Sequence, residues 1–264
     1  MKRRTFLNAV LAVTAACILL PMVVIAIWSV TGRWPWPGLI PESWTLRTLE
    51  ELFFGSAKLP KLLGSSISLA ATVALLATVI GILTSRATEF FEFPGKSLIR
   101  FSGMLPLLVP GTVFAMGIQL VMLKLGLADK IAGVVLVHLV CALPYCIAIM
   151  GDVTRAVGIR LEEQAQVLGA SPLRAFFAVT LPALLPGILS SMSMGFILSY
   201  SQYFTTLMVG GGRVKTIALV LVPYIQSGDR ALASAYSVAF VGSAMIVFFI
   251  FEALIQKLQK EGNA

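Results

Sequence analysis

Residues 160–187, RLEEQAQVLGASPLRAFFAVTLPALLPG, begin with a polar, helix-forming stretch that separates two long apolar runs of the chain. Each of the neighbouring runs is long enough to cross a membrane as a helix. A short amphipathic segment between two such runs is typical of a docking element for a partner in the cytoplasm. We call residues 160–180 the elbow.

Glycine, serine and proline predict two short helices within the elbow. Gly169 is expected to end the first helix, because glycine adopts the left-handed conformation without a Cβ clash. Ser171 and Pro172 are typical of a helix start, with serine as N-cap and proline at the first helical position, which places a second helix at about 172–179. Three apolar side chains share one face of this second helix: Leu173, Phe176 and Phe177. The two helices would meet at a fixed corner and present an aromatic surface to the cytoplasm; the alternative is a hairpin that only caps the bundle.

The composition indicates a membrane protein. Hydrophobic residues make up 58% of the 264 residues and charged residues 12%, whereas soluble domains carry about 25% charged residues. Six runs without a charged residue are each long enough to cross a hydrocarbon core, which needs about 20 helical residues. The spans built on these runs are expected at about 6–30, 62–85, 101–123, 131–151, 183–205 and 231–256, the last of which extends past its uncharged run, 231–251. Period-two alternation is missing, so we expect an all-α membrane protein with six transmembrane helices.

The predicted spans form a single membrane domain with two parts. Residues 1–61 would hold the first span and an outer loop, and residues 62–264 would form the transmembrane core. Within the third span, Pro106 and Pro110 are expected to permit a kink. The run after the basic residues 2–4 continues to Val30, which is too long for a cleaved signal peptide, so we expect it to remain as the first span.

Several function classes find no support in the sequence. The net charge of +8 comes from basic residues at span ends, where they anchor to head groups, so we expect no nucleic-acid partner. An odd number of cysteines inside apolar runs predicts packing residues and neither a disulfide nor a metal site; they are Cys17, Cys141 and Cys146. No Gly-x-x-x-x-Gly-Lys-Ser/Thr phosphate loop occurs, so any ATP hydrolysis would belong to another chain and we assign no catalytic residue.

Basic residues and tryptophans predict the orientation. Eleven of the 20 Lys and Arg residues fall on the side of the N terminus, a bias too small to decide it alone. Residues 2–4, Lys-Arg-Arg, directly precede the first span, whereas Trp28, Trp34 and Trp36 mark its far end as an interface belt. We therefore place both termini in the cytoplasm.

Polar side chains within the spans are candidates for a translocation pathway. His138 is the one clearly ionisable residue in mid-span; it could line a pathway or be a hydrogen-bonded packing residue. The other candidates are uncharged: Gln119, Tyr145, Tyr200, Gln202 and Tyr203. No Asp or Glu lies in mid-span, so we expect a weak conduit whose selectivity is set by another protein.

The elbow resembles the EAA loop of inner-membrane subunits of binding-protein-dependent ABC importers. That pattern is Glu-Ala-Ala, three residues, Gly, nine residues, Ile, one residue and Leu-Pro. The matching positions are Glu163, Ala165, Gly169, Leu181 and Pro182. The departures, Gln164 for the first Ala and Val179 for Ile, are mild.

The resemblance implies a type I permease in a bacterial inner membrane and assigns the elbow as the coupling helix. It implies four kinds of partner: lipid, a second permease that is identical or homologous, ATP-binding subunits, and an extracytoplasmic solute-binding protein. ATP and Mg²⁺ would be bound by the ATP-binding subunits, and this chain would hold no cofactor. Gly169 would set the corner, Phe176 and Phe177 would supply buried contact, and Glu163 would make a polar contact or cap the corner. The region 209–229 favours import of polyamines, thiamine, ferric iron or phosphonates.

Two other classes are alternatives. An ion-coupled secondary transporter or channel would work without an ATPase, but usually shows inverted repeats and buried charges. A membrane-embedded enzyme would need a catalytic cluster of His, Asp or Glu, which a single histidine does not supply.

Overall fold

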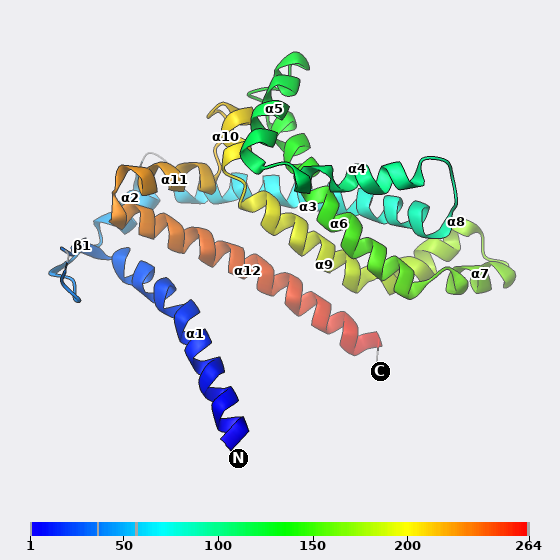
Figure 1. Ribbon diagram of the computed structural model, residues 1–264, viewed down its shortest axis with the longest axis horizontal. Helices are drawn as coiled ribbons and strands as arrows, with labels where there is room; N and C mark the ends of the chain where they lie inside the picture. Colours follow the sequence, from blue (N-terminus) through cyan, green and yellow to red (C-terminus); the bar gives the residue numbers. More distant parts are fainter. Residues whose placement is uncertain (1, 36, 56–57, 263–264) are drawn as a thin grey trace. The chain divides into compact units, whose positions relative to one another are not determined.

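The computed structural model describes residues 2–35, 37–55 and 58–262 of a mainly helical chain (Figure 1). Trp36, which the sequence places in the interface belt, lies outside the described residues. The chain forms two compact units. One contains Met1–Leu63 with Val220–Ser243, and the other contains Gly64–Leu219 with Ala244–Ala264.

The first unit joins the N-terminal helix to segments from late in the sequence. Its elements are α1 (Lys2–Trp28), β1 (Thr31–Arg33), β2 (Ser43–Trp44), α2 (Arg47–Phe54), the end of α11 (Ile217–Ser227) and the start of α12 (Arg230–Gly262). The two short strands pair antiparallel. The rings of Trp28 and Trp34 stack at 5.2 Å, and the Arg230 guanidinium lies 5.1 Å from the centre of the Trp28 ring.

The second unit holds the helical core and the elbow. Its elements are most of α3 (Leu59–Phe90), α4 (Lys96–Leu108), α5 (Gly111–Lys124), α6 (Ile131–Val157), α7 (Arg160–Val167), α8 (Pro172–Ala175), the π-helical turn η1 (Phe176–Thr180), α9 (Leu181–Tyr200) and α10 (Phe204–Gly210). Helices α3, α6 and α9 lie side by side, with α7 and α8 at one end of α6 and α9 (Figure 1).

Small residues allow the core helices to approach closely. A Cβ atom on Gly81 of α3 would lie 3.1 Å from the Cys146 carbonyl of α6, and one on Gly195 of α9 would lie 3.1 Å from Cα of Ala74 in α3. Close backbone approach of this kind is typical of helix pairs in membranes, where packing replaces the hydrophobic effect. These contacts pack α3 tightly against α6 and α9, which also pack on each other.

Hydroxyl pairs add polar contacts between the same helices. Thr78 of α3 and Ser191 of α9 are hydrogen-bonded at 3.0 Å, and Ser85 of α3 bonds to Thr154 of α6 at 3.1 Å. All four side chains are buried. The register of α3 against its two neighbours is therefore fixed by specific bonds as well as by shape.

The expected membrane spans are confirmed with two corrections. In the described part of the chain, five helices are long and apolar enough to cross a membrane, and α4 with α5 gives a sixth if this bent pair is one span. The single helix expected over 101–123 is wrong, because α4 and α5 meet at an angle of 109°. The break lies at Val109, whose φ of −99° and ψ of 130° are extended. Pro110 disfavours the helical conformation for the residue before it, so the predicted kink becomes a full break.

The second correction concerns the fifth span. The sequence predicts a helix over about 172–179 and a separate span over 183–205, but the chain is helical from Pro172 to Tyr200 without a gap. In the wide turn η1 the Leu181 N–H donates to the Phe176 carbonyl, five residues back. This turn accommodates Pro182, which has no N–H to donate and disrupts an ordinary α-helix. The second helix of the elbow is therefore continuous with α9.

Candidate functional site

The corner of the elbow has the predicted geometry. Helix α7 ends at Val167, and Gly169 has a φ of +95°. The Ala170 N–H donates to the Ala165 carbonyl at 3.0 Å and the Gly169 N–H donates to the Gln166 carbonyl at 2.9 Å. This is the Schellman pattern, which satisfies the last carbonyls of a helix and requires a left-handed residue. Gly169 thus fixes the direction in which the chain leaves α7.

The second helix also starts as predicted. Ser171 is extended at the N-cap, its hydroxyl accepts from the Arg174 N–H at 3.4 Å, and Pro172 follows at the first helical position. With two short helices and two capping motifs, the backbone of the elbow is ordered at both sides of the corner.

Two of the three apolar residues predicted for the outer face of the second elbow helix are exposed. Leu173 is 73% exposed and Phe177 is 61% exposed. Phe176 is half-buried, because its ring packs on the cluster of Ile82, Met150 and Leu184. Phe176 is therefore turned partly toward the core, whereas Leu173 and Phe177 are accessible. The contact with a partner that the sequence assigns to Phe176 stays a prediction.

The other residues of the EAA pattern occupy different environments. Glu163 is exposed on α7, and Ala165 is half-buried on the same helix. Leu181 is half-buried and Pro182 is exposed at the start of α9. The pattern therefore combines residues that hold the shape of the elbow with residues that are available to a partner.

A buried polar group within the elbow was not expected from the sequence. Glu162 is 7% exposed. Its carboxylate accepts from Nη2 of Arg86 at 2.9 and 3.1 Å and from the Thr180 hydroxyl at 2.9 Å. Arg86 is the first charged residue after the run 62–85, and a charge at that position needs a partner when it is buried. The position of Arg86 was therefore the one feature of the sequence that could have predicted a buried ion pair here.

Two of the predicted pathway residues line one cavity of about 540 Å³. They are Tyr145 of α6 and Gln202, which lies between α9 and α10. The remaining lining residues come from α4, α5 and the break between them, and from α6, α9 and α10. They are Pro106, Val109, Gly111, Thr112, Phe114, Cys141, Leu198, Phe204 and Thr205. None of these lining residues carries a charge, so the cavity offers only neutral polar contacts.

His138 has the geometry of a packing residue. It is 1% exposed, its Nδ1 lies 2.9 Å from the Ser199 hydroxyl, and its Nε2 lies 2.9 Å from the Thr206 hydroxyl. Both ring nitrogens thus have partners within the chain, on α9 and α10. The arrangement favours the packing alternative over a role in the pathway.

The three other pathway candidates do not line this cavity. Tyr200 is buried and its ring stacks on Phe196 at 5.3 Å. Gln119 and Tyr203 are half-buried. Their assignment to the pathway stays a prediction.

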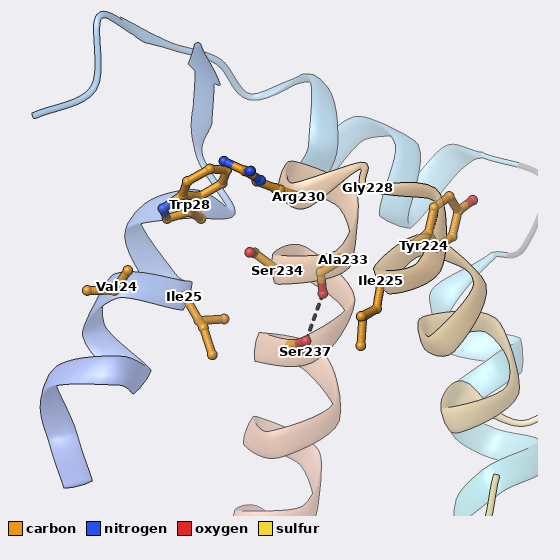
Figure 2. Close-up of a pocket in the computed structure, with 10 residues that line it drawn as sticks. All are labelled: Val24, Ile25, Trp28, Tyr224, Ile225, Gly228, Arg230, Ala233, Ser234 and Ser237. Atoms are coloured by element: carbon orange, nitrogen blue, oxygen red, sulfur yellow. Dashed lines mark hydrogen bonds between the residues drawn. The ribbon is translucent and has the colours of Figure 1, made fainter. Parts of the chain in front are cut away.

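The first unit contains a separate, mainly apolar hollow of about 360 Å³ (Figure 2). Val24, Ile25 and Trp28 of α1 line one side of it. The hydroxyl of Ser237 lies near it but already donates to the Ala233 carbonyl at 2.8 Å. Arg230 is the one charged group among its lining residues. Polar groups do not converge here, so the hollow lacks the features of a specific solute site.

These features define a class of protein: a multi-pass helical transport subunit with an ordered elbow between two long apolar helices. Residues 77–261 match the family described as binding-protein-dependent transport system inner membrane component. The chain belongs to this family and is a permease subunit of the ABC importer type.

Known proteins of this kind are similar over most of the chain. The putrescine transport system permease protein PotI of Escherichia coli K12 is 26% identical over 227 residues, covering 83% of this chain and 80% of the relative. The molybdenum transport system permease protein ModB of Haemophilus influenzae is 29% identical over 213 residues, covering 74% and 93%.

The fold is shared with a solved structure. A chain in the crystal structure of a bacterial ABC transporter involved in the import of the acidic polysaccharide alginate aligns with a TM-score of 0.72. The alignment covers 97% of this chain and 96% of that chain at 14% identity. At this identity the likeness concerns the fold alone, and it confirms the expected all-α membrane architecture.

Proposed function

We propose that this chain forms the translocation path of an ATP-driven solute importer and that its elbow docks on a separate ATP-binding subunit. The observation that carries this proposal is the exposure of Leu173 and Phe177 on a segment whose backbone is fixed by two capping motifs. Leu173 and Phe177 lie at the start of the continuous helix 172–200, next to the polar helix α7. An exposed phenylalanine with an exposed leucine one turn before it is typical there of the apolar centre of a protein interface.

Coupling follows from the stiffness of the elbow. The ATP-binding subunits would bind ATP and Mg²⁺, and their closure would move whatever is docked on them. Because α8 and η1 continue into α9 without a gap, a displacement of the docked surface would be passed directly to a core helix. Glu163, which is exposed on α7, is available for a polar contact with the partner.

The remaining assignments follow from membership of the family. We propose that two permease chains, identical or homologous, enclose the path and that an extracytoplasmic solute-binding protein delivers the solute. The elbow and both termini would face the cytoplasm, in a bacterial inner membrane. The basic residues in the first turn of α1 and the tryptophans at and beyond its other end support this orientation.

The neutral cavity supports a path with weak contacts. A site that must release its solute after each cycle benefits from contacts that are few and uncharged, and selectivity would then be set by the solute-binding protein. We propose a small solute of the polyamine, thiamine, iron or phosphonate group. The name of the putrescine permease supports this choice, whereas the molybdenum permease of similar identity lies outside the group.

The docking proposal can be tested by purification from the membranes of the chain's own host. The tagged chain should carry Mg²⁺-dependent ATPase activity, which Phe177→Asp should lower about tenfold or more, because central aromatic anchors dominate interface energies. Phe91→Asp is a matched control, since Phe91 is also exposed but lies outside the elbow. Solute flux through liposomes that contain this chain alone would instead favour the secondary transporter or channel.

A further inference from the structure

Two adjacent glutamates of the elbow point to opposite environments. Glu163 is exposed, whereas Glu162 is buried and bound inside the chain. One residue of α7 is therefore available to a partner, and the residue before it is engaged by the core.

The carboxylate of Glu162 joins three elements of the second unit. Arg86 comes from α3, Glu162 from α7 and Thr180 from η1, with donor–acceptor distances from 2.9 to 3.1 Å. We call these three residues the latch. Since η1 continues into α9, the latch connects the elbow to two core helices, α3 and α9.

Aromatic rings hold the Arg86 guanidinium in place. Its central carbon lies 4.7 Å from the centre of the Phe176 ring and 5.5 Å from that of Phe90. The cation is attracted to the faces of both rings. This contact explains why Phe176 turns inward and gives the latch a second attachment to η1.

The latch is strong but not fully satisfied. Nη1 of Arg86 is buried and has no hydrogen-bond partner among the described residues. Buried polar groups are usually paired, and an exception carries an energetic cost. A buried ion pair is also intolerant of losing one partner, because the other charge is then left unpaired.

The turn closed by the latch is itself unusual. Thr180 is the last residue of η1, and single π-helical turns are frequently found at functional sites. By holding Thr180, Glu162 fixes the residue at which the elbow becomes α9.

We propose that Glu162 is a positioning residue for transport. Through Arg86 and Thr180 it locks the elbow onto the adjoining ends of α3 and α9, so that both helices follow when the elbow moves. Glu163 would contact the ATP-binding subunit, and Glu162 would pass the movement of the elbow to α3 and α9. This inference rests on the proposed function, since it requires an ATP-binding subunit that moves the elbow.

The test uses the complete complex, with a cysteine introduced at the cavity (Thr112→Cys) in a chain that carries Cys17→Ser and Cys141→Ser. A maleimide reagent reports the accessibility of position 112 with and without vanadate-trapped nucleotide. In this parent complex, trapping should change the labelling rate at least about fivefold, the lower end of typical coupling between sites. With Glu162→Gln added, the ATP-binding subunit should still co-purify, but trapping should change labelling less than about twofold.

Further variants separate transmission from folding and docking. Glu163→Gln should reduce co-purification of the ATP-binding subunit and keep the labelling change in the complexes that remain. Thr180→Val, which leaves the ion pair intact, should lower the labelling change less than Glu162→Gln. Arg86→Met combined with Glu162→Gln should be no worse than either alone, because groups that act as one unit are not additive.

Each remaining outcome has a defined meaning. An unaltered labelling change in Glu162→Gln would overturn the latch, as would loss of the ATP-binding subunit in that variant. If no ATP-binding subunit accompanies the parent chain, or nucleotide leaves labelling at position 112 unchanged there, the proposed function fails and the latch fails with it.

Discussion

The elbow and the cavity differ in how much specific chemistry each contains. The elbow has a Schellman turn at Gly169, a capped helix at Ser171 and a buried ion pair at Glu162. The cavity has uncharged lining residues and contributes Tyr145 and Gln202 as its large polar groups. In the proposed function, the geometry is fixed most tightly where movement would be transmitted, whereas the cavity would make few demands on the solute.

The largest effect is expected for Gly169→Val, which tests the rigid side of this comparison. The left-handed conformation at φ +95° costs a β-branched residue about 1–2 kcal/mol, and the chain can avoid this cost by changing the corner. Apart from its two chain neighbours, no described residue has an atom within 4 Å of a Cβ built on Gly169, so the effect would come from the backbone. Transport should be abolished while membrane insertion stays intact, as measured by uptake and by membrane fractionation.

Two controls sharpen this prediction. Gly169→Asn should keep part of the activity, since asparagine tolerates the left-handed region. Gly117→Val, at a helical glycine that also has open space around it, should leave transport near its normal rate. Normal transport by Gly169→Val would show that the corner does not matter.

A large effect on stability, but not on selectivity, is expected for His138→Ala. The change removes a buried ring and leaves the Ser199 and Thr206 hydroxyls without their partner, at a cost of about 2–4 kcal/mol. Thermal unfolding of the detergent-solubilised chain would measure it. A variant of normal stability with altered solute preference would restore His138 to the pathway.

A smaller effect is expected in the cavity. Gln202→Ala and Tyr145→Phe should each change the KM for solute by no more than about fivefold, because single neutral hydrogen bonds contribute about 1 kcal/mol. Ser190→Ala, at a half-buried hydroxyl of α9 outside the cavity lining, is the control. A KM raised more than a hundredfold in either cavity variant would contradict the view of a weak path, because a single contact would then contribute about 3 kcal/mol.

The smallest effect is expected for Thr78→Val between α3 and α9. Hydrogen bonds between helices in membranes contribute about 0.6 kcal/mol on average. The variant should shift the unfolding midpoint slightly and leave ATPase activity per folded complex unchanged. A clear change in that activity would mean that the core helices slide along this contact during the cycle.

The sequence predicted local features of the backbone well. Gly169, Ser171 and Pro172 act on their immediate neighbours, so their spacing was enough to place both capping motifs. The long apolar runs likewise located the helices, because length and hydropathy decide whether a segment can cross a membrane.

Features that depend on residues far apart in the sequence could not be predicted. Glu162 and Glu163 cannot be distinguished from the local sequence. Only Arg86, which is 76 residues earlier, makes Glu162 the buried member of an ion pair. The inward turn of Phe176 has the same cause. The break at Val109 and the continuity of α8, η1 and α9 were also missed. A proline marks a position where the α-helical hydrogen bonding is interrupted, but does not show whether the chain bends, breaks or widens a turn there.

The central claim is that the elbow lies against an ATP-binding subunit. The most direct measurement is cross-linking in intact membranes from a cysteine introduced at the exposed position 173 (Leu173→Cys). The account predicts a covalent product with an ATP-binding subunit and no labelling of that position by an impermeant reagent added outside intact cells. Labelling from outside, with no cross-linked subunit, would contradict it.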